Sequence, residues 1–199
     1  MGYAKGRLGL AALGGVGVGL YTFFVRGSLT LDVGIGRSVR TLGPLSCQIA
    51  ASREVVFDIV SAPYLHKTPR ALESKLRVLE RGSNMVLAEH FTRVGPVVTT
   101  TLETVRFEPP ERVHFRLVRG PVPYVVEQFV LRETTGGTEL AYSGELGTDF
   151  WWLGRGWGGL VARRWVAAVR QSLSDIRGEA ERRAPLGHRL APRAGDIAS

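Results

Sequence analysis

One carboxylate interrupts an apolar strand face in the second half of the sequence. In the segment 124–132, Val125, Glu127 and Phe129 fall on one side, because side chains alternate along a strand. An ionised carboxylate on an apolar face is costly unless it has a partner or a raised pKa. Such a group can bind the polar part of a ligand or exchange a proton with it.

A hairpin brings a second polar group to the same face. Two glycines at 136–137 are typical of a tight turn, and a second alternating segment follows at 138–146. In that register Glu127 lies opposite Gly144, and Tyr142 lies one pair away. Glu127 and Tyr142 are therefore the candidates for acid/base chemistry.

Two interpretations of Glu127 remain open. It contacts a ligand, or it is a structural group that lies near a cavity mouth or pairs with an arginine of the last helix. Arg164 is the best placed arginine, because it lies beside the apolar stripe of that helix and next to Trp165.

Other kinds of chemistry find little support in the sequence. The lone cysteine, Cys47, excludes an internal disulfide and a cysteine metal cluster. The histidines have no metal-ligand spacing, and no serine-histidine-aspartate arrangement is recognisable. We therefore expect no metal and no cofactor. The histidines are His66, His90, His114 and His188.

The elements that position these residues follow in a simple order. A strand at 46–52 precedes a helix that begins at Arg53 and ends at Ala62-Pro63, and a second short helix is expected over 64–74. A long amphipathic helix over 157–183 closes the domain. Between the helices, period-two segments are predicted at 76–81, 84–94, 97–107, 112–118, 124–132 and 138–146. This order predicts an α+β fold in which an antiparallel sheet of about seven strands packs against the last helix.

Three motifs, taken in order, resemble a known superfamily. They are Ile-Ala-Ala-Ser-Arg-Glu-Val-Val-Phe-Asp at 49–58, Val-Arg-Phe-Glu-Pro-Pro-Glu-Arg-Val at 105–113 and Thr-Gly-Gly-Thr-Glu-Leu at 135–140. Together they are similar to the SRPBCC, or START-like, superfamily of polyketide cyclases, dehydrases and lipid-transport domains, in a membrane-anchored form of actinobacterial style. The resemblance spans 46–183. It implies a helix-grip fold, in which a curved sheet wraps around the C-terminal helix and encloses an apolar cavity.

The resemblance also implies a range of functions. The leading one is binding or carriage of a small hydrophobic ligand, such as a lipid, a quinone or a polyketide-like molecule. The alternatives are a cyclase or dehydratase that uses Glu127 and Tyr142, and a non-catalytic interaction module; we expect a binding protein rather than an enzyme. Strand and helix periodicity predict these ligand-binding residues: Phe115, Leu117, Val125, Glu127, Phe129, Tyr142, Trp157, Val161, Arg164, Trp165 and Ala168.

The first part of the chain predicts a membrane anchor. Leu8–Val25 contains 18 uncharged residues, which as a helix span about 27 Å, close to the ~30 Å hydrocarbon core of a bilayer. A single-pass helix within 1–27 is therefore expected; a signal peptide and a buried or interfacial helix are the alternatives. Basic residues flank both ends, so the side of the membrane stays open. A small-residue face that would suit a homodimer comprises Ala11, Gly15 and Gly19.

The remaining segments complete the domain organisation. We expect a linker over 28–45, the ligand-binding domain over 46–184 and a disordered tail over 185–199. The formal charge of +8 favours anionic partners such as lipid headgroups. No nucleic-acid partner is expected, because no aromatic platform is interleaved with the basic residues. Tryptophans at 151, 152 and 157 either pack in the core or form a cavity rim that touches the bilayer.

Overall fold

A computed structural model describes residues 22–23, 26–27, 29–66, 72–94 and 97–188. Most of the expected anchor lies outside these residues, and so do Ala11, Gly15 and Gly19. Within the described part of the chain, no helix is long and apolar enough to cross a membrane.

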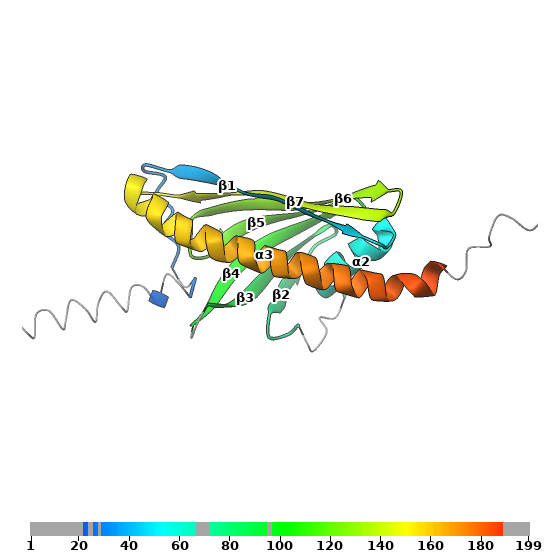
Figure 1. Cartoon of the computed structure of the whole chain (residues 1–199). Helices are drawn as coiled ribbons and strands as arrows, with labels where there is room; N and C mark the ends of the chain where they lie inside the picture. Colours follow the sequence, from blue (N-terminus) through cyan, green and yellow to red (C-terminus); the bar gives the residue numbers. More distant parts are fainter. Residues whose placement is uncertain (1–21, 24–25, 28, 67–71, 95–96, 189–199) are drawn as a thin grey trace, which may run out of the picture.

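Seven antiparallel strands form one curved sheet (Figure 1). Consecutive strands are neighbours from β2 to β7, and β1 closes the sheet by pairing with β7. The order is thus β1-β7-β6-β5-β4-β3-β2. The bounds are β1 (Ser38–Ile49), β2 (Leu76–Arg81), β3 (Met85–Val94), β4 (Val97–Glu108), β5 (Arg112–Arg119), β6 (Tyr124–Thr134) and β7 (Gly137–Thr148).

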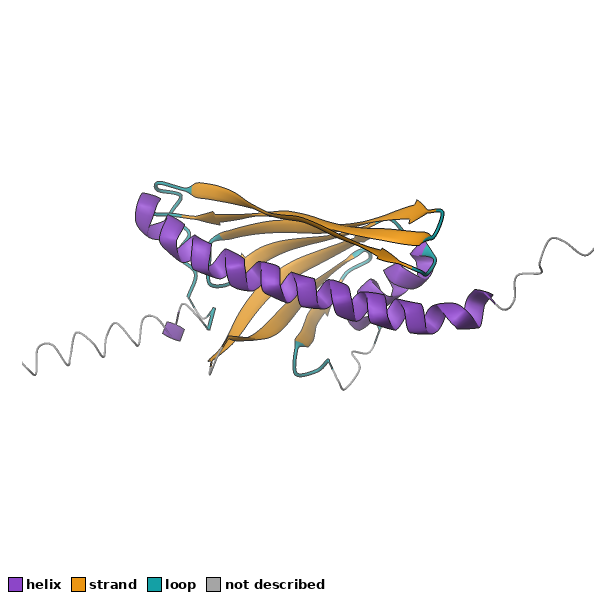
Figure 2. Ribbon diagram, in the orientation of Figure 1, coloured by secondary structure: helices purple, strands orange, loops and turns teal. Residues whose placement is uncertain are grey.

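Two helices pack against this sheet (Figure 2). The long helix α3 (Trp151–His188) runs along one face and contacts β1, β7 and the shorter helix α2 (Arg53–Leu65). The α+β class and the helix-grip arrangement expected from the sequence are both confirmed.

The helix α2 begins where its cap predicts and ends later than expected. The Ser52 side chain accepts a hydrogen bond from the Val55 N–H at 3.4 Å, which caps the first turn. The expected end at Ala62-Pro63 is wrong, because the helix continues through Pro63 to Leu65 and the His66 N–H still donates to the Ala62 carbonyl at 3.0 Å. Pro63 has no N–H to donate, so the helix continues past it with one backbone hydrogen bond fewer. Tyr64 therefore belongs to α2, not to a second short helix.

Two boundaries of the domain also differ from the expectation. β1 begins at Ser38, not at 46, because it pairs with β7 from Ser38 onward. An irregularity between Leu42 and Leu45 interrupts the alternation and hides this strand in the sequence. The helix α3 begins before 157 and includes 185–188, which were expected in the tail; residues 189–199 lie outside the described part.

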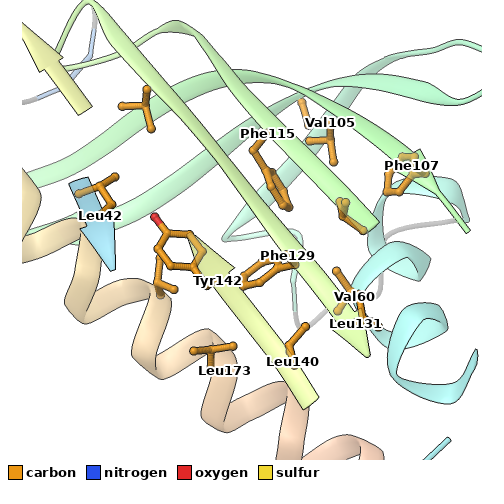
Figure 3. Close-up of a cluster of buried hydrophobic side chains, with 14 of the residues drawn as sticks. Leu42, Val60, Val105, Phe107, Phe115, Phe129, Leu131, Leu140, Tyr142 and Leu173 are labelled. Atoms are coloured by element: carbon orange, nitrogen blue, oxygen red, sulfur yellow. The ribbon is translucent and has the colours of Figure 1, made fainter. Parts of the chain in front are cut away.

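The core lies between the inner face of the sheet and the two helices. Figure 3 shows Tyr142 and Phe129 inside this apolar cluster, and their ring centroids are 5.6 Å apart. Phe129 also packs edge-on against Phe115, at 5.7 Å. Val125, Phe129 and Leu131 are buried, so the predicted inward face of β6 is confirmed.

Candidate functional site: a buried carboxyl group between the sheet and the last helix

Glu127 lies on the inner face of β6, and only 9% of it is exposed. Its neighbours across the sheet are Phe115 on β5 and Gly144 on β7. A Cβ atom at Gly144 would lie 2.7 Å from the Cβ of Glu127, closer than real side chains approach. The glycine therefore allows β7 to lie close against the backbone and Cβ atom of Glu127.

Two hydrogen bonds hold the carboxyl group, and both end on the same oxygen. The Tyr142 hydroxyl donates to Oε2 at 2.5 Å, and the indole Nε1–H of Trp165 donates to it at 2.6 Å. Tyr142 lies one pair along the hairpin, as the register predicts. Trp165 comes from α3, so Glu127 connects the helix to the sheet. No hydrogen bond to Oε1 is seen among the described residues.

The surroundings favour the neutral form of Glu127. Burial, together with the nearby charge of Glu103, raises its pKa to about 8, although the bonds from Tyr142 and Trp165 oppose the shift. Because Oε2 accepts two hydrogen bonds, the proton of the neutral acid belongs on Oε1. Burial and the adjacent Glu127 also raise the pKa of Tyr142 above its usual range, so this phenol remains a donor. The neutral form of Glu127 would present an O–H group on Oε1.

A second polar cluster lies on neighbouring strands of the same inner face. Glu103 on β4 is 5% exposed, and its Oε1 accepts a hydrogen bond from the Thr101 hydroxyl at 2.6 Å. Its Oε2 lies 3.3 Å from His90 Nδ1, and His90 Nε2 lies 2.9 Å from the Tyr64 hydroxyl. Burial raises the pKa of Tyr64 above its usual range. The cluster links α2, β3 and β4, and Glu103 influences the protonation of Glu127.

Sequence reasoning did not identify Glu103 or Tyr64. The alternation along β4 contained a signal for Glu103, because Val105 and Phe107 share its inward face. No sequence pattern indicated that Tyr64 lies in this cluster, because Tyr64 was expected in a separate helix.

The alternative in which Glu127 pairs with Arg164 is not the arrangement that the structure shows. Arg164 is exposed on α3, and the hydrogen bonds to Glu127 come from Tyr142 and Trp165. Adjacent helical residues differ by about 100° around the axis, so the residue next to Trp165 points elsewhere.

Most other predicted lining residues lie inside the domain. The inner face of α3 includes Trp157, Val161 and Trp165, at intervals of four residues. The Nε1–H of Trp157 donates to the Pro121 carbonyl at 2.7 Å. That any of these residues contacts a ligand stays a prediction. The buried ones are Phe115, Leu117, Val125, Phe129, Tyr142 and Val161, and the half-buried ones are Trp157, Trp165 and Ala168.

A cavity of about 280 Å³ lies at the start of α3 and includes Trp157 in its lining. Its walls are mostly apolar, with Leu31, Pro121 and Leu153 among them, and Glu127 does not line it. Trp165 stands on the same helix face as Trp157, about 12 Å further along the axis. The inner face of α3 therefore leads from this cavity towards Glu127.

Within the described residues, no group of three histidine, cysteine or acidic side chains could hold a metal ion.

The fold and the site together define a helix-grip domain with a polar group in an apolar interior. A family model described as "Polyketide cyclase / dehydrase and lipid transport" matches residues 45–181. The chain belongs to this family. No curated protein matches the sequence.

Solved structures with the same fold include enzymes of two kinds. The Zhui aromatase/cyclase from a Streptomyces species is 18% identical, with a TM-score of 0.57 over 73% of this chain and 96% of that one. The di-domain aromatase/cyclase StfQ of the steffimycin pathway is 16% identical, with a TM-score of 0.56 over 75% and 52% of the two chains. Norcoclaurine synthase from Thalictrum flavum, in complex with dopamine and hydroxybenzaldehyde, is 13% identical, with a TM-score of 0.57 over 78% and 90%. At these identities the likeness shows the fold alone.

Proposed function

We propose that this domain binds a small, mostly apolar molecule that carries a carbonyl or hydroxyl group, and that Glu127 contacts this group. The observation that carries the proposal is the carboxyl group itself. It is buried in an apolar interior, with two donors on Oε2 and no hydrogen bond to Oε1 among the described residues. A ligand oxygen at Oε1 would complete its hydrogen bonding.

The apolar side chains around Glu127 indicate that the remainder of the ligand is apolar. Phe115 and Phe129 flank Glu127 on the inner face, and rings of this kind suit flat or hydrocarbon groups. A lipid, a quinone or a polyketide-like molecule fits this combination of an apolar body and one polar group. Carriage of such a molecule is the leading use of the domain.

A second candidate is an acid-catalysed reaction at the same position. A carboxyl group with a pKa of about 8 is protonated at neutral pH and can still give up its proton. Glu127 would then protonate a ligand oxygen from Oε1, with Tyr142 and Trp165 stabilising the carboxylate that remains. Aromatase/cyclases share this fold and the family description includes dehydrases, which makes cyclase or dehydratase chemistry the relevant class.

We also propose that the domain works at a membrane, attached by a single helix within 1–27. This rests on the 18 uncharged residues of Leu8–Val25 and on their length. Protease protection of the full chain in membrane vesicles would test the attachment and report the side on which the domain lies.

The substitution Glu127→Gln separates the binder from the enzyme. The amide oxygen can accept from Tyr142 and Trp165, and its NH₂ group then replaces the donor at Oε1, but it has no proton to transfer. A binder should keep its ligand at neutral pH, whereas an enzyme should lose turnover. Glu111→Gln, at an exposed position, is the matched control.

The ligand itself should be found by solvent extraction of the purified full chain and mass spectrometry. Titration with the apolar dye Nile red gives a second measure of binding. If no apolar molecule copurifies and no dye enters the interior, the proposal fails, and an interaction module becomes the better description.

A further inference from the structure

The end of the domain at the start of α3 exposes a concentration of large apolar side chains. Trp152 is 70% exposed, and Trp151 and Leu153 are about as open, at 60% and 61%. The segment before β1 adds an alternating row of exposed aliphatic residues beside them. We call this patch the tryptophan surface and define it as Leu31, Val33, Ile35, Trp151, Trp152 and Leu153.

Hydrogen bonds join the two segments of this surface into one patch. The backbone N–H of Phe150 donates to the Ile35 carbonyl at 2.9 Å, and that of Trp151 donates to the Gly36 carbonyl at 3.0 Å. The Asp149 carboxylate accepts from the Val33 N–H at 2.9 Å. Figure 1 shows the start of α3 and the chain before β1 at the same end of the domain. The tryptophan surface is therefore built from residues more than a hundred positions apart in the sequence.

The backbone adopts an uncommon conformation to display these aromatic side chains. Phe150 and Trp151 have φ values of 69° and 48°, a left-handed region that bulky residues rarely enter. The Trp151 ring packs over Gly36, where a Cβ atom would lie 2.4 Å from the indole. Strained backbone of this kind is held by its surroundings and concentrates at functional sites.

Positive charge follows the surface along α3, while Asp32, between Leu31 and Val33, is exposed and pairs with Arg37. From Trp151 to Ser174, α3 has no acidic residue, and its first carboxylate is Asp175. The arginines of that stretch are all exposed, namely Arg155, Arg163, Arg164 and Arg170. Tryptophan next to arginine suits the boundary between lipid headgroups and acyl chains, and the arginines favour anionic headgroups.

The chain enters the described domain at this same end. The Arg26 carbonyl accepts from the Thr100 N–H at 3.0 Å, and the Thr30 hydroxyl donates to the Gly120 carbonyl at 2.7 Å. The uncharged segment Leu8–Val25 stops directly before Arg26. The described chain after that segment is thus bonded to β4 and to the turn after β5, next to Pro121 in the cavity wall.

We propose that the tryptophan surface docks into the interfacial region of a bilayer that contains anionic phospholipid. The domain then sits with the start of α3 and the cavity beside Trp157 towards the lipid. This inference concerns the orientation of the domain and holds for any ligand at Glu127.

The test uses the full chain in vesicles of phosphatidylcholine and phosphatidylglycerol, with bromine atoms on the acyl chains to quench nearby tryptophan. The wild type should be quenched. The double variant Trp151→Phe, Trp152→Phe should lose most of this quenching while it stays bound to the vesicles. Trp157→Phe is the matched control, because its indole is partly buried, and it should keep the quenching.

A charge introduced into the surface gives an independent measurement. Trp152→Glu should reduce quenching of the remaining tryptophans, whereas Leu79→Glu, also at an exposed position but on β2, should not. Vesicles of phosphatidylcholine alone should quench the wild type less, because the arginines lose their anionic partners.

Three outcomes would overturn the proposal. The first is a vesicle-bound wild type whose tryptophans are not quenched. The second is equal quenching in the wild type and the double variant. The third is an unquenched dimer that Trp152→Glu converts to a monomer, which would make the surface an interface between two copies of the chain.

Discussion

Two buried carboxyl groups in this domain face opposite electrostatic surroundings. Glu127 is in the interior with neutral donors from Tyr142 and Trp165, and its pKa rises to about 8. Asp149 is even less exposed, but the Arg37 guanidinium donates to it at 2.7 Å. This pair, with backbone N–H groups of Val33 and Gly34, lowers the pKa of Asp149 below its usual value.

Both carboxyl groups are buried, so the comparison shows that the hydrogen-bond partners, not the burial, decide whether the pKa is raised or lowered. A cation and backbone donors stabilise the charged form of Asp149, so the group serves as a structural clamp. Two neutral donors do not offset the desolvation of Glu127, so its pKa stays above the usual value. The two groups also give opposite pH dependences of stability.

The largest expected effect is that Glu127→Gln removes the pH dependence of stability that Glu127 causes. The folded pKa of about 8 exceeds the unfolded value of 4.5, so the unfolded chain ionises first as the pH rises. Between these values the wild type should lose stability relative to the variant, by up to about 1.4 kcal/mol per pH unit. Urea denaturation of both proteins at pH 5 and pH 8 measures this difference in stability. If the stability of both proteins changed equally between the two pH values, the raised pKa of Glu127 would be contradicted.

Breaking the clamp should cost stability at neutral pH. Asp149→Ala leaves Arg37 and the N–H groups of Val33 and Gly34 without this acceptor, which should cost about 3 kcal/mol of unfolding free energy. The loss should shrink as the pH falls below the ordinary aspartate range, where the wild-type carboxylate also becomes protonated. Glu179→Gln, which removes two ion pairs on the surface of α3, to Arg182 and Arg183, should cost much less. Equal midpoints for the two variants in urea would refute the clamp.

A side chain opposite Glu127 should disturb the site directly. Gly144→Ala places a methyl group 2.7 Å from the Cβ of Glu127, and such overpacking should cost about 1–3 kcal/mol. Binding of Nile red or of the copurified ligand should weaken in parallel. Gly136→Ala, in the turn of the same hairpin, has open space around the added carbon and should behave as the wild type. A stable Gly144→Ala protein with unchanged binding would show that the carboxyl group does not depend on this space.

The smallest expected effect follows from removing one donor. The hydrogen bond from Tyr142 to Oε2 lowers the pKa of Glu127 in the wild type. Tyr142→Phe deletes this bond, so the pKa of Glu127 should rise further. The stability loss should be about 1 kcal/mol, and the pH window of the Glu127 effect should extend upward. Tyr124→Phe, whose hydroxyl lies 3.5 Å from the exposed Glu145, is the control and should leave the window in place.

Much of this fold follows from local sequence patterns. Six of the strands begin and end within a few residues of their alternating segments, and the register of Glu127 with Gly144 follows from the Gly-Gly turn. β1 began earlier than expected because the irregularity between Leu42 and Leu45 breaks the alternation. The start of α3 was missed because its first turns are rich in glycine, which gives no helical periodicity.

The candidate site was only partly predictable, for a geometric reason. Glu127 and Tyr142 lie on adjacent strands of one hairpin, so alternation alone brings them together. Trp165 and Glu103 reach the site from other elements, and their approach depends on how α3 sits on the sheet and how far the sheet curves. Arg164, the arginine considered as a structural partner of Glu127, is exposed because of the rotation of α3 about its axis, and the neighbouring Trp165 bonds to Glu127 instead.

The pairing of β1 with β7 has a consequence for the way the chain folds. Ser38 pairs with Thr148, so the first strand of the sheet has no partner until the last strand, β7, has been synthesised. At about 5–20 residues per second the ribosome needs several seconds to make that interval. During this time β1 is an unpaired edge that can join other chains. We therefore expect slow, non-local folding, and a nascent chain that depends on chaperones until β7 emerges.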